Sequence, residues 1–187
     1  MAARAPRASG GGGRLKTVCL HGSESTGKTT LARELAKHFK TIMVPEFGRL
    51  YCEIFGNDCD LGDLRAIRRG HDLMAAAGRR KANKILILDT DAIMTAVWAD
   101  VLLGARPPDL DRIDDPADLY LLCDIDVPFE TDAIRYFPDV AMRKNMFDQA
   151  KEELEKRNLP FSIIRGTRAE RLSAAIAAIT NRFPEIA

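Results

Sequence analysis

A glycine-rich segment that ends in Lys-Thr is the part of this sequence with the clearest capacity for chemistry. The segment reads Gly22-Ser23-Glu24-Ser25-Thr26-Gly27-Lys28-Thr29, followed by Thr30, and matches the pattern GxxxxGK[ST]. Glycines let such a loop fold tightly, so that backbone N–H groups point at phosphate oxygens and a following helix adds its dipole. Lys28 would neutralise β/γ-phosphate charge and Thr29 would ligate Mg²⁺. The pattern predicts that Gly22–Thr29, with Thr30, binds ATP and Mg²⁺.

A carboxylate and a guanidinium follow the second apolar segment. Glu46 and Arg49 are three residues apart, so they share one face if the segment is helical. Two interpretations are open: a pair that faces a phosphoryl acceptor, or an ordinary ion pair in a first helical turn that favours Glu. Their place directly after a strand favours the first interpretation. Glu46 is then a candidate base and Arg49 a candidate substrate contact.

Two acids follow the third apolar segment, residues 84–88. An apolar run that ends in Asp is typical of the site that holds Mg²⁺ beside a phosphate loop, so Asp89 is a candidate metal ligand or base. Asp91 either contacts the acceptor or caps the helix that follows. Trp98 is the sole tryptophan, and it belongs either to the core or to a wall of the acceptor pocket.

Residues 129–144 are predicted to form a lid. In small kinases a mobile lid closes over the phosphates and delivers arginines. Arg135 and Arg143 suit that role, and both are candidate catalytic residues. The alternative is that both arginines are solvated and pair with nearby acids.

An α/β fold would bring these residues together. Apolar segments at 16–21, 41–44, 84–88, 119–123 and 161–164 predict strands, and segments at 28–39, 47–55, 61–82, 92–103, 142–157 and 169–183 predict helices, with a loop at 105–116. Strands that alternate with helices predict a three-layer α/β/α P-loop NTPase with a parallel sheet of about five strands, like nucleoside and nucleotide kinases. Ligands in such sheets lie beyond the carboxyl ends of the strands.

Composition and charge limit the classes of protein that fit. The chain has 187 residues, 46% of them hydrophobic, and its 28 basic and 27 acidic residues give a net charge of +1. We expect a flexible tail at 1–13 and one domain at 14–187. The charge balance argues against binding nucleic acid or a membrane. The lack of a signal peptide in the tail and four scattered cysteines predict a cytoplasmic protein with reduced thiols.

A small-molecule kinase is the class that these observations favour. The length argues against an oligomeric AAA-type motor, and the sequence CDIDVP after the fourth strand lacks the base-reading motif of a GTPase. Two alternatives stay open: an ATP-hydrolysing switch that acts through a partner, and a kinase for another small metabolite. The sequence leaves open the oligomeric state and the choice of ATP over GTP.

Several separate blocks resemble one known family. GSESTGKTTLARELA, VPEFGRLYCEIFG, LILDTDAIMTAVW and VPFETDAIR, in this order, are similar to the nicotinamide riboside kinase domain of the bacterial NAD-salvage regulator. The similarity runs from about Lys16 to the carboxyl terminus. It implies transfer of the ATP γ-phosphate to the 5′-hydroxyl of nicotinamide riboside or a similar nucleoside as small-molecule acceptor.

The resemblance also implies roles for individual residues. It assigns the phosphate loop to Gly22–Thr29, the acceptor-side pair to Glu46 and Arg49, and the acids after the third strand to Asp89 and Asp91. In the lid it assigns Asp132 to the substrate and Arg135 to the phosphates. Whether Glu46 or Asp89 is the base stays open.

Overall fold

The computed structural model describes residues 14–127 and 139–186, so the predicted tail at 1–13 lies outside the described residues. Its strands are β1 (Lys16–His21), β2 (Met43–Val44), β3 (Ile85–Asp89), β4 (Leu119–Cys123) and β5 (Phe161–Ile164). Its helices are α1 (Lys28–His38), α2 (Phe47–Phe55), α3 (Leu61–Arg79), α4 (Ala92–Leu103), α5 (Pro108–Asp111), α6 (Val140–Lys156) and α7 (Arg168–Arg182), with a final turn η1 (Pro184–Ile186). Among these helices, none is both long and apolar enough to cross a membrane.

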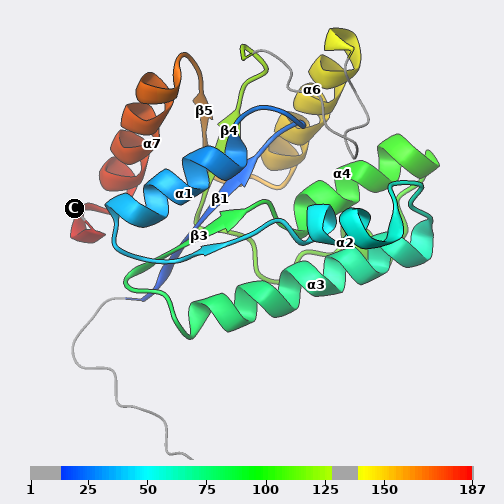
Figure 1. The fold of residues 1–187 in the computed structure, drawn as a ribbon, viewed down its shortest axis with the longest axis horizontal. Helices are drawn as coiled ribbons and strands as arrows, with labels where there is room; N and C mark the ends of the chain where they lie inside the picture. The colour runs from blue at the N-terminus through cyan, green and yellow to red at the C-terminus, as the bar shows by residue number, and fades with distance from the viewer. Residues whose placement is uncertain (1–13, 128–138, 187) are drawn as a thin grey trace, which may run out of the picture.

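The five strands form one parallel sheet in the order β2-β3-β1-β4-β5 (Figure 1). The predicted α/β class and the sheet of about five parallel strands are confirmed. Because β1 lies between β3 and β4, the residues that follow these three strands meet at one edge of the sheet. The register pairs Leu20 with Asp89, which sets the end of β3 beside the end of β1.

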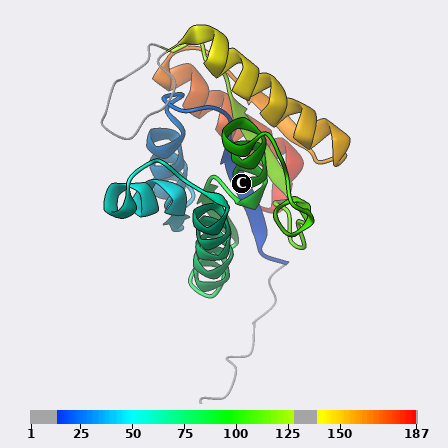
Figure 2. The same ribbon diagram turned by 90° about the vertical axis from the view of Figure 1, so that its right-hand side faces the viewer.

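Two helical layers cover the sheet, as Figures 1 and 2 show. On one face, α1 and α7 pack through Leu35 and Ile179 against β1, β3 and β4. On the other face, α4 and α6 pack through Val97 and Leu154. Strands buried on both faces have no polar alternation, which is the pattern expected for a parallel sheet.

The chemistry of the helix ends explains several boundaries. Asp60 and Asp63 form a reciprocal capping box at the start of α3, and Thr167 and Glu170 form another at α7. The Asp139 side chain accepts a hydrogen bond from the Ala141 N–H, so α6 begins at Val140, two residues before the predicted start.

One expected loop contains a helix. The segment predicted as a loop at 105–116 holds the short helix α5, whose first residue is Pro108. Proline fits the first helical position because the missing N–H has no partner there in any case. The same proline made this segment look irregular in the sequence.

The contact of helix α2 with α3 is closest at a glycine of α3. A Cβ atom added to Gly70 would lie 2.1 Å from the Phe47 ring. Phe47 is the first residue of α2, directly after Glu46. Glycine at position 70 therefore sets how closely α2 approaches α3, and with it the position of Glu46.

Replacing Gly70→Ala should lower the free energy of unfolding by about 1–3 kcal/mol, because the Phe47 ring must move to admit the methyl group. Urea denaturation followed by circular dichroism measures the loss. Arg69→Ala is the matched control, since Arg69 is exposed on the same turn of α3. Equal stability of Gly70→Ala and the wild type would contradict this packing.

Candidate functional site

The predicted phosphate loop joins β1 to α1, and its backbone requires glycine at both ends. Gly22 has a φ of 117°, and an added Cβ would lie 2.8 Å from the backbone oxygen of Cys123. Gly27, the N-cap of α1, has a φ of 77°. Side chains are disfavoured in this left-handed region. The loop therefore turns tightly from the sheet edge into the amino-terminal end of α1.

The Lys28 side chain folds back along this loop. Its ammonium group donates hydrogen bonds to the carbonyl oxygens of Gly22, at 3.0 Å, and Ser23, at 2.6 Å. The Thr26 hydroxyl donates to the Ser23 carbonyl oxygen at 2.9 Å. The loop thus holds a cation and a helix N-terminus together, which is the combination that binds phosphate.

Asp89 and Thr29 fit a divalent cation. Asp89 is 1% exposed, and burial raises the pKa of its carboxyl group, while a hydrogen bond with Thr29 lowers it. Within the described residues, Oδ1 of Asp89 is buried without a hydrogen-bond partner. A buried carboxylate oxygen beside a hydroxyl is a suitable donor set for Mg²⁺.

A cavity of about 520 Å³ runs from the phosphate loop and α7 to α2, α3 and α4. Its volume is in the range of small-molecule sites. Of residues 22–30, all except the buried Ser23 line it. Glu46, Arg49 and Trp98 line it as well, so the structure brings most of the predicted site residues to one cavity.

Glu46 is the titratable group of this cavity with a pKa near neutrality. Burial raises the pKa of Glu46 to about 7, and the nearby charge of Lys28 opposes the rise. Glu46 is the N-cap of α2, and Arg49 lies in the first turn, where its guanidinium pairs with Glu53 at 3.1 Å. A carboxyl group with this pKa can accept a proton at neutral pH.

Asp91 caps α4, and the geometry separates it from the predicted acceptor contacts. Its carboxylate accepts hydrogen bonds from the Ile93 N–H at 3.0 Å and from the Tyr120 hydroxyl at 2.7 Å. Asp91 is not part of the cavity lining, whereas Trp98 both lines the cavity and packs against the core. Trp98 is thus both a core residue and part of the cavity wall, and its contact with an acceptor stays a prediction.

The predicted lid lies largely outside the described residues. Asp132 and Arg135 belong to the segment 128–138, of which the structure describes nothing. Arg143 is described: it is 3% exposed in the first turn of α6, and its guanidinium donates to the carbonyl oxygens of Ser25 and Val127, each at 3.4 Å. Arg143 is thus buried against the phosphate loop, not solvated.

With this geometry in hand, comparison with known sequences identifies the family. The profile of a family described as an AAA domain (AAA_28) matches residues 17–171, most of the chain. The chain belongs to the AAA_28 family. The matched range includes the phosphate loop, the other cavity residues named above, and all of α6.

One regulator of NAD biosynthesis is a relative of this AAA_28 domain in both sequence and structure. The trifunctional NAD biosynthesis/regulator protein NadR of Escherichia coli (strain K12) is 29% identical over 153 residues, which cover 79% of this chain and 37% of that protein. A solved NadR protein in complex with NR matches with a TM-score of 0.68 and 27% identity, over 91% of this chain and 52% of that one. The AAA_28 domain therefore spans about a third to a half of these relatives.

A kinase of known structure shares the fold at low sequence identity. A deoxyadenosine kinase from M. mycoides, with dCMP and dCDP bound as products, matches with a TM-score of 0.66 and 10% identity, over 88% of this chain and 99% of that one. At this identity the likeness concerns the fold alone. It confirms the predicted resemblance of the AAA_28 domain to nucleoside and nucleotide kinases.

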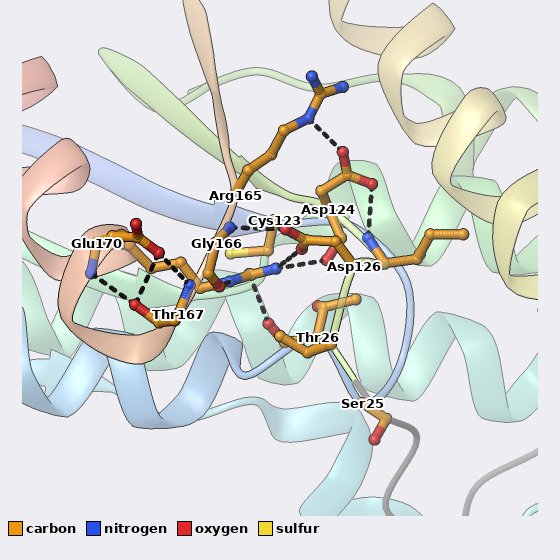
Figure 3. A network of polar contacts seen from close by, with 12 residues as sticks. Ser25, Thr26, Cys123, Asp124, Asp126, Arg165, Gly166, Thr167 and Glu170 are labelled. Carbon is orange, nitrogen blue, oxygen red and sulfur yellow. Dashed lines mark hydrogen bonds and ion pairs between the residues drawn. The ribbon is translucent and has the colours of Figure 1, made fainter.

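Arg171 of the AAA_28 domain is a site residue that sequence reasoning missed. It lines the cavity and is 5% exposed. Its guanidinium donates to the carbonyl oxygens of Thr26 at 3.0 Å, Gly166 at 2.9 Å and Asp124 at 3.0 Å, and pairs with Asp126. Figure 3 labels these four partners. One side chain therefore joins the phosphate loop, the end of β4 and the turn after β5.

The signals for the missed residues were present but weak. The capping box Thr167-x-x-Glu170 marks the start of α7 at the end of β5, where Arg168 and Arg171 line the cavity. His71 lines it too; burial lowers the pKa of His71 to about 4, so the ring is neutral. On the apolar side of a long helix, His71 had the pattern of a core residue.

Replacing Arg171→Lys should lower the free energy of unfolding by about 2 kcal/mol and weaken nucleotide binding, because an ammonium cannot make the same set of bonds. Denaturation and titration with a fluorescent ATP analogue measure the two effects. Arg165→Ala is the control: Arg165, which is 65% exposed, pairs with the neighbouring Asp124, and such surface pairs contribute little. If the two variants behaved alike, Arg171 would not hold the loop.

If Glu46 accepts the proton of the acceptor, kcat/KM for that acceptor should rise with pH through an inflection near 7, because the carboxylate form is the active one. Glu46→Gln should be slow at every pH and lose the inflection. Steady-state rates from about pH 5 to pH 9 test this, with the exposed Glu152→Gln as control. A flat profile for the wild type would rule Glu46 out as the base.

Proposed function

We propose that this AAA_28 domain is an ATP- and Mg²⁺-dependent kinase for a small nucleoside, with nicotinamide riboside as the first candidate acceptor. The observation that carries the proposal is the single cavity that joins the phosphate loop to Glu46. One part of the cavity suits a triphosphate and another offers a carboxyl group with a pKa near 7. The NadR structure in complex with NR, the abbreviation of nicotinamide riboside, supports the choice of acceptor.

The triphosphate would bind over the loop at Gly22–Thr29. Lys28 would neutralise charge on the β- and γ-phosphates. Thr29 and Asp89 would hold Mg²⁺, which, when bound, supplies further positive charge to the phosphate oxygens. Arg143 is buried beside Ser25 and would add a cation near the phosphates, together with Arg135 of the lid segment.

The acceptor would bind between α2 and α4. Glu46 would orient the 5′-hydroxyl group and accept its proton while the oxygen forms a bond to the γ-phosphorus. The bond between the γ-phosphorus and the bridging oxygen breaks, and ADP leaves with that oxygen. Arg49 and Trp98 would contact the nucleoside, and Asp132 is assigned to it through the resemblance alone.

Incubation with ATP, Mg²⁺ and a panel of nucleosides that includes nicotinamide riboside tests the proposal. We expect ADP formation that depends on one nucleoside and a product heavier by one phosphoryl group, both measured by mass spectrometry. Slow ADP formation without dependence on any nucleoside would contradict a kinase and favour the switch. Phosphorylation of another metabolite would support the assignment as a kinase and identify a different acceptor.

Lys28→Ala should lower nucleotide affinity and abolish turnover, because positioning and charge neutralisation carry most of phosphoryl transfer. Lys37→Ala is the control, since Lys37 lies on the exposed side of α1. Trp98 is the only tryptophan and lines the cavity, so its fluorescence should show whether Lys28→Ala still binds the acceptor when turnover is lost. Unchanged ATP affinity and turnover in Lys28→Ala would overturn the assignment of the loop.

A further inference from the structure

Two thiols lie side by side in the wall of the cavity. The sulfur atoms of Cys52, in α2, and Cys59, in the loop before α3, are 3.8 Å apart. Both side chains are half-buried and both line the cavity. Cys19 and Cys123 are different, because both are fully buried in the sheet. The pair at 52 and 59 is therefore open to a small oxidant that enters the cavity.

The backbone around this pair has room to adjust. A disulfide requires an S–S distance of about 2.05 Å, so the sulfurs must approach by about 1.8 Å. Helix α2 has no fully buried side chain, and Cys59 follows Gly56 and Asn57 in an irregular segment. Segments with few buried contacts move at low energetic cost.

We propose that Cys52 and Cys59 are a dithiol modification site, which a low-molecular-weight disulfide such as glutathione disulfide converts reversibly to an intramolecular disulfide. In this scheme the Cys59 thiolate attacks one sulfur of glutathione disulfide and releases one glutathione thiolate. The Cys52 thiolate then displaces the second. The two cysteines lose two protons and two electrons, and glutathione disulfide gains them as two glutathione molecules.

The second step sets the rate of this exchange. In the reduced chain, burial and the neighbouring Cys59 raise the pKa of Cys52 to about 12, and burial, the largest cause, still raises it once Cys59 carries glutathione. Cys52 is therefore a protonated thiol at neutral pH, and its attack on the mixed disulfide is slow. The conversion should accelerate as the pH rises, because the thiolate is the nucleophile.

The disulfide would fix the wall of the cavity on the acceptor side; this consequence rests on the proposed function. Cys52 lies three residues after Arg49, on the same face of α2. A bond to Cys59 pins that face to the loop before α3, and α2 begins directly after Glu46. The phosphate loop has no part in the bond, so oxidation should weaken acceptor binding and leave ATP binding unchanged.

Peptide mapping tests the modification site without any assay of activity. Trypsin releases residues 50–65 as one peptide that contains both cysteines, because no Lys or Arg lies between Arg49 and Arg65. The folded chain is treated with glutathione disulfide, alkylated with iodoacetamide and digested. We expect this peptide to be two hydrogen atoms lighter and unalkylated, and to regain two alkylatable thiols after dithiothreitol.

Single variants identify the partners. Cys52→Ser should keep a glutathione adduct on Cys59, because the thiol that resolves it is gone, whereas Cys59→Ser should acquire little. Cys19 and Cys123 should stay reduced throughout and serve as internal controls. Persistence of the adduct in the wild type after prolonged incubation at alkaline pH, or alkylation of both cysteines after oxidation, would overturn the disulfide.

Calorimetric titration separates this proposal from the kinase proposal. Oxidation should lower acceptor affinity about tenfold and leave ATP affinity unchanged, since small displacements at an oriented site are costly. Cys59→Ser, which should acquire little adduct, should show no such response to the oxidant. A disulfide without change in acceptor affinity would overturn the regulatory part. If no nucleoside binds the reduced chain, the kinase proposal fails, and the peptide map still decides the modification site.

Discussion

The pairing of β1 between β3 and β4 is the constraint on which the site depends. Parallel pairing places the carboxyl ends of all three strands at one edge, and the register sets Asp89 level with Leu20, two residues before Gly22. This alignment of strands brings together three separate stretches of the chain: the phosphate loop, Asp89 and the end of β4 that Arg171 contacts. A shift of one residue would send the side chains of β1 to the opposite face of the sheet.

Two opposing electrostatic effects act on the carboxyl groups of Glu46 and Asp89. Burial raises the pKa of both the Glu46 and the Asp89 carboxyl groups, the charge of Asp89 raises that of Glu46 further, and Lys28 lowers both. Neither carboxylate is fully compensated by protein cations, so a divalent ion at Asp89 would satisfy one of them directly. The buried negative charge would become favourable if a divalent cation brought compensating positive charge.

Local patterns predicted the parts of the molecule that depend on neighbours in sequence. The GxxxxGK[ST] motif predicted the phosphate loop, and the apolar runs predicted the parallel strands. The end of the second apolar run at Pro45 placed Glu46 after β2. The structure has all three features. A capping box marked the helix of Arg171, but the contacts of Arg171 could not be predicted this way, because its partners lie 5, 47 and 145 residues away. Asp91 could be interpreted in two ways, and its bond to Tyr120, 29 residues away, became visible only in three dimensions.

Substitution of Arg171 and substitution of its partners should affect these contacts to different degrees. Three of its partners are backbone carbonyl groups, at Thr26, Asp124 and Gly166. Every amino acid carries such a carbonyl, so a new side chain at these positions leaves the acceptor in place wherever the backbone permits it. The guanidinium has no substitute of this kind. Most of the side chains around Arg171 could therefore change during evolution without loss of these hydrogen bonds, whereas a change of the arginine itself would remove them.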